Sequence, residues 1–201
     1  MFYLLDESGS PWYNCLLQDI CAVHMKGSIY NWWCINMIEY CDLYNENRVK
    51  LGKTHLRGEP LGEGTYHIVV NVWIINYKDE ILLTQRHPQK KLWGGLWECS
   101  ASGAILAGED SIQGALRETK EEIGVDLSSS EGILLETIVR DDNTIRDTFL
   151  FKKNISIDDL ALQPNEVINA KWVTKQEYEG MCNDGLIALP TTNFWELYTQ
   201  K

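Results

Sequence analysis

Three glutamates in one short segment have the types and spacing of a metal site. Glu118, Glu121 and Glu122 stand at positions i, i+3 and i+4. If the segment is helical, each residue advances by about 100°, so the three carboxylates share one face. Like charges at this spacing repel one another and raise their pKa values, and a divalent cation removes the repulsion. Oxygen ligands of this kind suit Mg²⁺ or Mn²⁺ rather than a metal that prefers sulfur.

The alternative interpretation of the same glutamates is a solvated acidic helix face, which is what most runs of charge are. Arg117 precedes the first glutamate and is positioned to neutralise or orient a neighbouring carboxylate. Mg²⁺ usually keeps several waters and meets the phosphates of a substrate. If the glutamates bind metal, the segment is therefore expected to process a phosphate compound.

The glutamate segment must also bury an apolar face. The spacing predicts a helix over residues 110–123, in which Ile112, Leu116 and Ile123 fall within about 40° of one another, opposite the carboxylates. Gly124 stands where a left-handed cap commonly ends a helix. One face of this helix is thus expected to pack into a core and the other to present the three glutamates.

The rest of the chain predicts a mixture of strands and helices. Residues 67–75 (HIVVNVWII) are the strongest strand, because they are rich in β-branched and aromatic residues. A loop broken by Pro and Gly is expected over residues 86–97 (RHPQKKLWGGLW). Further strands are predicted over 38–44, 80–85, 133–140, 146–152 and 167–173, and further helices over 175–181 and 192–199. Mixing without strict alternation favours an α/β sandwich with a mixed sheet.

Composition and charge exclude several classes of partner. The 201 residues include 18 Lys and Arg against 29 Asp and Glu, a formal charge of −11. Such a chain is a poor binder of a nucleic acid duplex, because phosphate contacts need clustered cations. No stretch approaches the roughly 18 uncharged apolar residues of a membrane helix, so no membrane partner is expected.

Cysteine usage favours a reducing, cytoplasmic location. The chain has six cysteines, no CxxC pair and no apolar secretory signal at its start. Cys21 and His24 have a ligand-like spacing, but no second pair matches it, so a structural zinc site is not expected there.

Residues 1–36 differ from the rest of the chain. They contain four charged residues and seven aromatic ones, and neither the helical nor the strand period persists in them. A regular pattern begins at Met37. Residues 1–36 are therefore interpreted as an N-terminal extension, either a misassigned start or an arm that packs on the domain of residues 37–201.

The glutamate segment resembles the Nudix box, G-x5-E-x7-R-E-U-x-E-E-x-G-U, where U is aliphatic. The match over residues 103–125 is carried by Gly103, Glu109, Arg117, Glu118, Glu121, Glu122, Gly124 and Val125. Thr119 replaces the first aliphatic residue, and it falls on the buried side, away from the metal site. The resemblance implies a Nudix-type α/β/α sandwich with a mixed β-sheet.

The same resemblance implies an activity. Nudix proteins mostly use Mg²⁺ or Mn²⁺ to hydrolyse the diphosphate bond of a nucleoside diphosphate linked to another moiety. The expected partner is thus a small-molecule diphosphate substrate, and homodimers are common in the family. A non-catalytic Nudix-fold binding module is an alternative, although such modules usually lose the glutamates that this chain keeps.

Roles for single residues follow from the resemblance. Glu118, Glu121, Glu122 and the carbonyl of Gly103 would hold the metal. Arg117 would orient the cluster, Glu109 would support it from the preceding loop, and a carboxylate would deprotonate the attacking water. The general base is open: Glu166 is the outside candidate, and Asp141, Asp142 and Asp147 compete with it.

Residues 53–172 also resemble type 1 isopentenyl-diphosphate isomerase, a Nudix-fold enzyme that does not hydrolyse its substrate. The resemblance is carried by the stretches TYHIVVNVWII, QRHPQKKLWGGLW and NEVINAKW. By that register Arg86 and Lys90 would grip a diphosphate, which suits two cations in one loop. His67 would match a metal-site histidine of the isomerase, although a packing role is the commoner one at a strand start.

The protonating residues of the isomerase are missing at the matching places. Its cysteine, its histidine and its two later glutamates correspond to Ser102, Ala104, Thr144 and Arg146. Cys99 stands three residues early, and an odd offset on a strand points to the opposite face. A hydrolase is therefore favoured, and an isomerase would need Cys99 to point into the pocket.

Three aromatic residues near the predicted site have two interpretations. Tyr66, Trp93 and Trp97 could stack on a base, which would favour a nucleotide substrate. They could equally anchor the core or the loop.

Overall fold

A mixed sheet of seven strands organises the residues that the computed structural model describes, 38–188, 191 and 194–200. Five strands run in the order β5-β4-β3-β8-β7, β6 also pairs with β3, and β9 pairs with β4. Only β3 (His67–Ile75) and β8 (Thr144–Lys152) pair in parallel among these named strands. The others are β4 (Ile81–Arg86), β5 (Trp97–Glu98), β6 (Ala101–Ala104), β7 (Ile133–Val139) and β9 (Val167–Val173). The hypotheses about residues 1–36, Cys21 and His24 lie outside the described residues.

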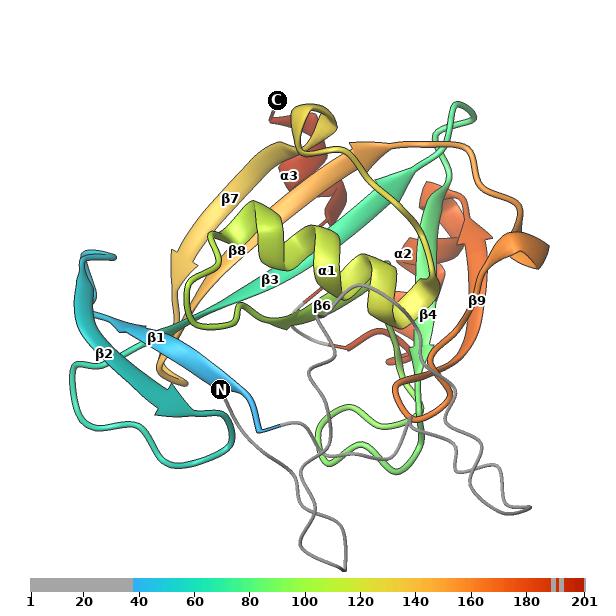
Figure 1. Cartoon of the computed structure of the whole chain (residues 1–201). Helices are drawn as coiled ribbons and strands as arrows, with labels where there is room; N and C mark the ends of the chain where they lie inside the picture. Colours follow the sequence, from blue (N-terminus) through green and yellow to red (C-terminus); the bar gives the residue numbers. More distant parts are fainter. Residues whose placement is uncertain (1–37, 189–190, 192–193, 201) are drawn as a thin grey trace, which may run out of the picture. The chain divides into compact units, whose positions relative to one another are not determined.

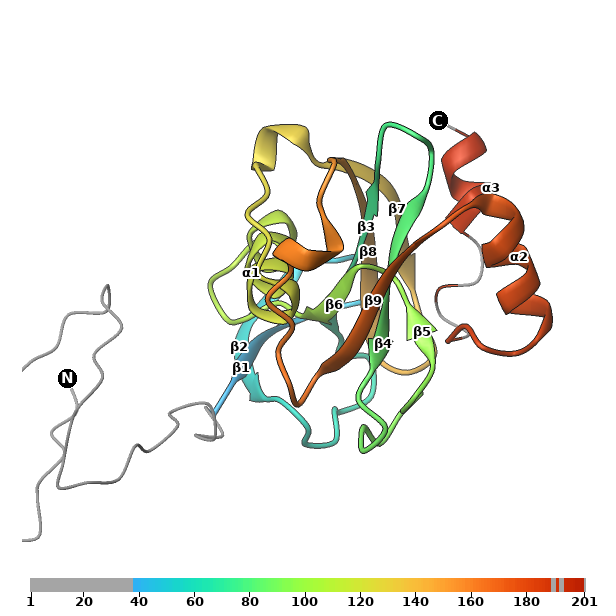
Figure 2. The same cartoon turned by 90° about the vertical axis from the view of Figure 1, so that its right-hand side faces the viewer.

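Helices cover both faces of this sheet (Figure 2). Helix α1 (Ser111–Ile123) lies on one face, and α2 (Lys175–Asn183) and α3 (Phe194–Thr199) lie on the other. Short 3-10 turns occur at Ser129–Glu131 and Ile157–Asp159. The arrangement is the predicted α/β/α sandwich.

The alternation of side chains along β3 explains the two cores. Val70 and Val72 pack in the cluster that contains Ile123 of α1. Trp73 packs in a second cluster, with Tyr178 of α2 and Phe194 of α3. Because successive strand residues point to opposite faces, one apolar strand serves both layers.

A hairpin of two strands forms a separate small sheet, with β1 in blue and β2 in teal in Figure 1. Strand β1 (Tyr40–Tyr44) begins two residues later than predicted and pairs with β2 (Lys50–Leu56). The backbone N–H of Ala107 donates to the carbonyl of Tyr40 at 2.7 Å, so β1 lies against the loop that leads into α1.

Several strand boundaries differ from the sequence expectations. The sequence does not predict strands β2, β5 and β6. Residues of β2 are mostly exposed and lack an apolar alternation, while β5 and β6 are two and four residues long, and β6 consists of small residues. Tertiary pairing makes these strands, and a local pattern does not reveal it. None of the helices among the described residues is long and apolar enough to cross a membrane.

One ion pair, between a partly exposed arginine and a buried carboxylate, ties the hairpin to the main sheet. Arg48, in the turn between β1 and β2, donates from Nη1 to Oδ1 of Asp147 at 2.5 Å and from Nη2 to Oδ2. Asp147 lies on β8, is fully buried, and also accepts from the hydroxyl of Thr137 at 2.6 Å. Burial by itself raises the pKa of Asp147, but the hydrogen bonds from Arg48 and its neighbours outweigh burial and lower it.

We expect Arg48→Met to destabilise the protein at neutral pH by about 1–3 kcal/mol, because it leaves a buried carboxylate without its main donor. Urea unfolding measures the effect. A group with a lowered pKa stabilises the fold above its ordinary pKa of 3.8 and loses that effect as the pH falls further. The difference between the two proteins should therefore shrink below that pH.

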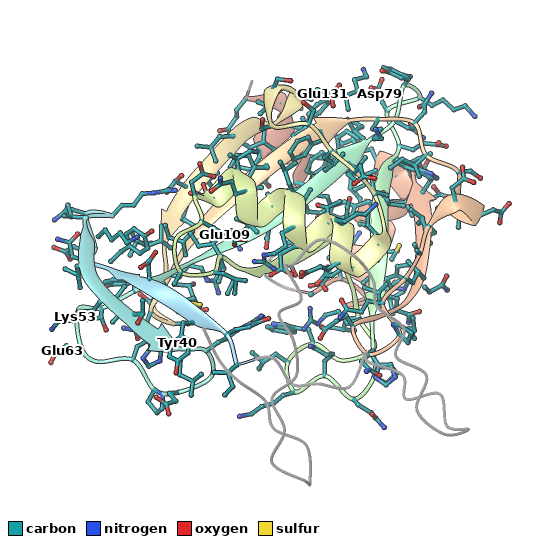
Figure 3. The ribbon with its side chains drawn as sticks, in the orientation of Figure 1. Tyr40, Lys53, Glu63, Asp79, Glu109 and Glu131 are labelled. Atoms are coloured by element: carbon teal, nitrogen blue, oxygen red, sulfur yellow. The ribbon has the colours of Figure 1, made fainter. Side chains whose placement is uncertain are left out.

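Lys53→Met is the matched control, because Lys53 is exposed on the outer side of the same hairpin (Figure 3). It should change stability by less than about 0.5 kcal/mol. Equal losses from the two substitutions would contradict the role given to the Arg48–Asp147 pair.

Candidate active site

A pocket of about 320 Å³ lies beside α1 and gathers most of the predicted site residues. Its walls come from β3, β6, α1, the loop after β4 and the loop before β9. The predicted site residues in its lining are Arg86, Lys90, Gly103, Glu118, Glu121, Glu122 and Glu166. Arg117 does not line the pocket. Segments far apart in the sequence thus bring two cations and four carboxylates together.

Local signals fix where α1 begins and ends. The side chain of Asp110 accepts from the N–H of Gln113 at 2.8 Å, and the side chain of Gln113 accepts from the N–H of Asp110 at 2.9 Å. This reciprocal pair is a capping box. Gly124 ends the helix with a φ of 75°, in the left-handed region that favours glycine. The predicted helix is confirmed to within one residue.

Two of the three glutamates of α1 are buried. Glu118 is 6% exposed and Glu122 is 5% exposed, whereas the Glu121 side chain is 46% exposed. The solvated acidic face is therefore wrong for Glu118 and Glu122, because the pocket walls cover them. Thr119 is fully buried, as predicted, and its hydroxyl donates to the carbonyl of Ala115 at 2.7 Å.

The apolar side of α1 is covered less completely than the sequence predicts. Ile123 is fully buried, while Ile112 and Leu116 are only partly buried where they pack on the first core. Small residues, Gly114 and Ala115, provide the rest of the buried contact. Helix α1 is thus buried on two sides, one apolar and one carrying carboxylates.

Arg117 links the glutamates to one another. Its Nη1 donates to Glu118 and to Glu121 at 3.0 Å each, and its Nη2 donates to the carbonyl of Ala104 at 2.9 Å. Its Nε donates to Glu109 at 2.8 Å. Glu109 also accepts from the N–H of Leu106 at 2.8 Å, in the loop beneath α1 (Figure 3). These contacts give Arg117 and Glu109 the means to orient the cluster.

Burial raises the pKa of the two inner glutamates. It raises the pKa of Glu118 to about 7, against the opposing charge of Arg117. Burial also raises the pKa of Glu122 well above its ordinary value, and the nearby charges of Glu98 and Glu118 add to it. A hydrogen bond from the N–H of Ser102 to Glu122, at 3.1 Å, acts in the opposite direction.

The carboxylates fit a hard divalent cation by chemistry, although their side chains do not converge. Among the described residues, no three His, Cys, Asp or Glu side chains group as ready metal ligands. Arg117 holds Glu118 and Glu121 as their counter-ion instead. A cation at Glu118, Glu121 and Glu122 would relieve the like charges of this pocket, and oxygen donors suit Mg²⁺ or Mn²⁺.

Gly103 on β6 lies directly against the carboxylate of Glu118. A Cβ added at Gly103 would lie 2.1 Å from Cδ and Oε1 of Glu118. Glycine leaves room for the carboxylate where it lies, and a larger residue would require the Glu118 side chain to move. The Gly103 backbone therefore lies beside the predicted metal ligand Glu118.

Each predicted substrate-binding cation holds a carboxylate. Arg86 Nη1 donates to Oε1 of Glu98 at 2.6 Å, and Lys90 Nζ forms an ion pair with Glu166. Glu98 is a pocket residue that sequence reasoning misses. Burial raises its pKa and the charge of Arg86 opposes the rise. A charged residue inside a stretch of small and apolar residues, WECSAS, is the signal that could have found it.

The other three candidates for the general base, Asp141, Asp142 and Asp147, lie outside the pocket lining. Asp147 is engaged by Arg48, and Asp142 accepts from Arg140 and Thr144. Neither these two nor Asp141 is in the pocket lining, which includes Glu166. Among the base candidates, Glu166 alone faces the pocket within the described part of the chain.

Cys99 does not point into the pocket. It is fully buried in the second core, its Sγ donates to the carbonyl of Ala101 at 3.2 Å, and burial raises its pKa well above the ordinary value. Ser102 and Ala104 line the pocket instead. The condition set for an isomerase is therefore not met.

The remaining candidate residues, one histidine and three aromatic residues, lie partly in the pocket and partly in the two cores. His67 and Trp93 line the pocket, and burial lowers the pKa of His67, with the Arg57 charge adding to the effect. Trp97 packs on the second core and Tyr66 on the first. Only Trp93 of the three aromatic candidates thus stands where it could meet a substrate.

Comparison with known proteins identifies the family. The family profile described as NUDIX domain matches residues 65–188. A protein of Listeria monocytogenes named an uncharacterized Nudix hydrolase is 39% identical over 148 residues, which are 74% of this chain and 87% of that protein. The chain belongs to the Nudix family.

A second similar sequence and two similar solved structures were also found. An isopentenyl-diphosphate Delta-isomerase of Escherichia coli O127:H6 is 28% identical over 138 residues, 67% of this chain and 76% of the relative. The crystal structure of DR0079 from Deinococcus radiodurans matches with a TM-score of 0.64 at 22% identity, covering 81% of this chain and 98% of that one. The structure of a NUDIX hydrolase from Nitrosomonas europaea matches with a TM-score of 0.54 at 20% identity, covering 67% of this chain and 89% of that one, which agrees with the Nudix fold.

Gly103→Ala should weaken Mn²⁺ binding by more than about tenfold, because the added methyl group displaces the Glu118 carboxylate. Titration with Mn²⁺, followed by electron paramagnetic resonance, measures the affinity. The control is Gly180→Ala in α2, where an added Cβ meets no atom within 4 Å. That variant should bind Mn²⁺ normally, and unchanged binding by Gly103→Ala would refute the placement of the metal at Glu118.

Metal binding should release protons at neutral pH, because Glu118 and Glu122 have raised pKa values and must be deprotonated to bind a cation. Calorimetry in two buffers with different ionisation enthalpies measures the release. The affinity should rise from about pH 6 to about pH 8. The same enthalpy in both buffers would argue against ligation by these glutamates.

Proposed function

We propose that this protein is a Nudix hydrolase that cleaves the diphosphate bond of a nucleoside diphosphate linked to another moiety, with Mg²⁺ or Mn²⁺. The observation that carries the proposal is the pair of buried glutamates, Glu118 and Glu122, in a pocket that also contains Arg86 and Lys90. Carboxylates largely removed from solvent favour a bound cation, and the two basic side chains suit a phosphate compound.

The proposed reaction is a hydrolysis. Water attacks one phosphorus, the bridging P–O bond breaks, and each product leaves with one phosphate while protons pass to solvent. When bound, Mg²⁺ or Mn²⁺ would offset the charge that develops on the phosphate oxygens and lower the pKa of a water. Glu118, Glu121, Glu122 and the carbonyl of Gly103 are the proposed ligands.

The other residues of the pocket bind and orient. Arg117 holds Glu118 and Glu121 in place through its two hydrogen bonds from Nη1. Arg86 and Lys90 are proposed to exchange their carboxylate partners, Glu98 and Glu166, for phosphate oxygens. Release of Lys90 frees Glu166 to accept the proton of the attacking water. The location of Glu166 in the pocket lining supports this role.

Two alternatives receive less support. An isomerase needs a cysteine in the pocket, and the corresponding place holds Ser102 while Cys99 packs in the core. A binding module has no need for the intact set of Glu109, Glu118, Glu121 and Glu122. The preserved set favours catalysis.

The first test is release of phosphate-bearing products from a panel of diphosphate compounds in Mg²⁺, Mn²⁺ or EDTA. The panel includes nucleotide sugars, ADP-ribose, dinucleoside polyphosphates, nucleoside triphosphates and isopentenyl diphosphate. We expect metal-dependent cleavage of at least one nucleoside diphosphate compound. Isomerisation of isopentenyl diphosphate, with no cleavage across the panel, would overturn the hydrolase proposal.

Glu122→Gln should lower that turnover by more than about 100-fold while the fold stays intact by circular dichroism. Glu131→Gln is the matched control, because Glu131 is exposed on the turn before β7 (Figure 3) and is not among the residues that line the pocket. Full activity of Glu122→Gln would rule out the proposed mechanism.

Glu166→Gln should lower kcat by about 100-fold or more with little change in KM.

A further inference from the structure

An asparagine interrupts the apolar run in the centre of β3. Asn71 lies between Val70 and Val72, which pack in the core that contains α1. Because successive residues of a strand point to opposite faces, the Asn71 side chain lies on the face covered by α2 and α3. Its backbone pairs with β6 on one side and β8 on the other, so the side chain is the part that meets the pocket. The pocket thus extends from the glutamates of α1 to the other face of the sheet.

The side-chain amide of Asn71 has no hydrogen-bond partner within the described part of the chain, although the residue is only 8% exposed. Buried polar groups are nearly always satisfied, so an exception needs an explanation. Asn76, just after β3, is equally buried, and its amide donates to Oε2 of Glu80 at 2.7 Å and accepts from the N–H of Lys78 at 2.8 Å. The Asn71 amide, by contrast, keeps two donors and an acceptor available to a ligand in the pocket.

Asn71 belongs to a row of polar residues that crosses four strands. The strand register pairs it with Ser102 of β6 on one side and with Thr148 of β8 on the other. Thr148 in turn pairs with Glu136 of β7. Oγ1 of Thr148 and Oε1 of Glu136 are buried and make no hydrogen bond with any described residue, although Arg146 lies 3.6 Å from the latter. A hydrocarbon placed on this row would leave its polar atoms unsatisfied, which costs affinity.

We propose that Asn71 determines specificity: its amide, with Ser102 beside it, binds the part of the substrate beyond the diphosphate. That part carries hydrogen-bond donors and acceptors and is not a hydrocarbon chain. The inference rests on the proposed function, since it takes the diphosphate to lie beside Glu118 and Glu122. A site built to hydrogen-bond a polar group strongly rejects an analogue without it, because the buried groups of the site are then left unpaired. Sugar hydroxyls and the edge of a base both have the required chemistry.

The test compares three ligands that share a non-hydrolysed methylenediphosphonate group, so that differences between them report on the rest of the molecule. They are α,β-methylene-ADP, ribose 5-methylenediphosphonate and isopentyl methylenediphosphonate, each titrated calorimetrically in Mg²⁺. The wild type should bind at least one of the two polar ligands more than about tenfold tighter than the isopentyl compound. Asn71→Leu should weaken binding of that ligand by roughly 10- to 100-fold and bind the isopentyl compound equally well or better. Asn71→Ala, which adds no bulk, should show the same loss of preference.

The two polar ligands distinguish the sugar from the base. A loss for both in Asn71→Leu places the sugar at Asn71, and a loss for α,β-methylene-ADP alone places the base there. An unchanged preference in the Leu and Ala variants, or a wild type that prefers the isopentyl compound, would overturn the proposal. Normal discrimination by a protein that hydrolyses no diphosphate compound would instead sink the hydrolase proposal and leave the role of Asn71 standing.

Unfolding in urea separates a ligand contact from a structural role. Because the Asn71 amide has no partner to lose, Asn71→Leu should leave the urea midpoint unchanged or raise it. Asn76→Leu is the matched control, since it removes the hydrogen bonds of a satisfied amide outside the pocket lining. Its midpoint should fall while its ligand preference stays normal. Equal falls of the midpoint in the two variants would show that Asn71 serves the fold, against the proposal.

Discussion

The structure of the site depends on the burial of two like-charged carboxylates, Glu118 and Glu122, one turn apart on α1. Removing a carboxylate from water costs on the order of several kcal/mol unless partners compensate it. Arg117 compensates Glu118, and the N–H of Ser102 compensates Glu122 in part. The pKa values of both groups are raised because these partners do not fully offset the effect of burial. Two buried carboxylates that are only partly neutralised favour the binding of a cation in the pocket.

The rest of the fold holds those carboxylates in place. The capping box at Asp110 and the left-handed Gly124 fix both ends of α1, and Gly103 lets β6 approach Glu118 without a clash. The two apolar cores anchor β3 from both faces, and β3 carries β6 by antiparallel pairing. A rigid sheet and a fully specified helix thus position groups whose mutual repulsion would otherwise separate them.

Sequence reasoning predicts the parts of this arrangement that local spacing encodes. The helix, the long strands and the sharing of one face by three glutamates all follow from periodicity. Strands β2, β5 and β6 do not follow from periodicity, because tertiary pairing makes them, and Glu98 is marked only by its charge within the stretch WECSAS. The degree of burial of Glu118 and Glu122 is likewise set by segments distant in sequence, such as the loop that carries Arg86 and Lys90.

The hairpin shows how stability and the site are connected. It is held at its turn by Arg48 on the buried Asp147, and at its other end by Arg57 on Glu39. The first pair is remote from the pocket lining and the second forms part of it. We expect loss of the first contact to loosen the hairpin that Arg57 directly follows, so an effect on ligand binding at the pocket can arise from a residue outside the pocket lining. Binding and unfolding measured on the same variants separate these two routes, since Arg48→Met should lower the unfolding free energy together with any change in ligand binding.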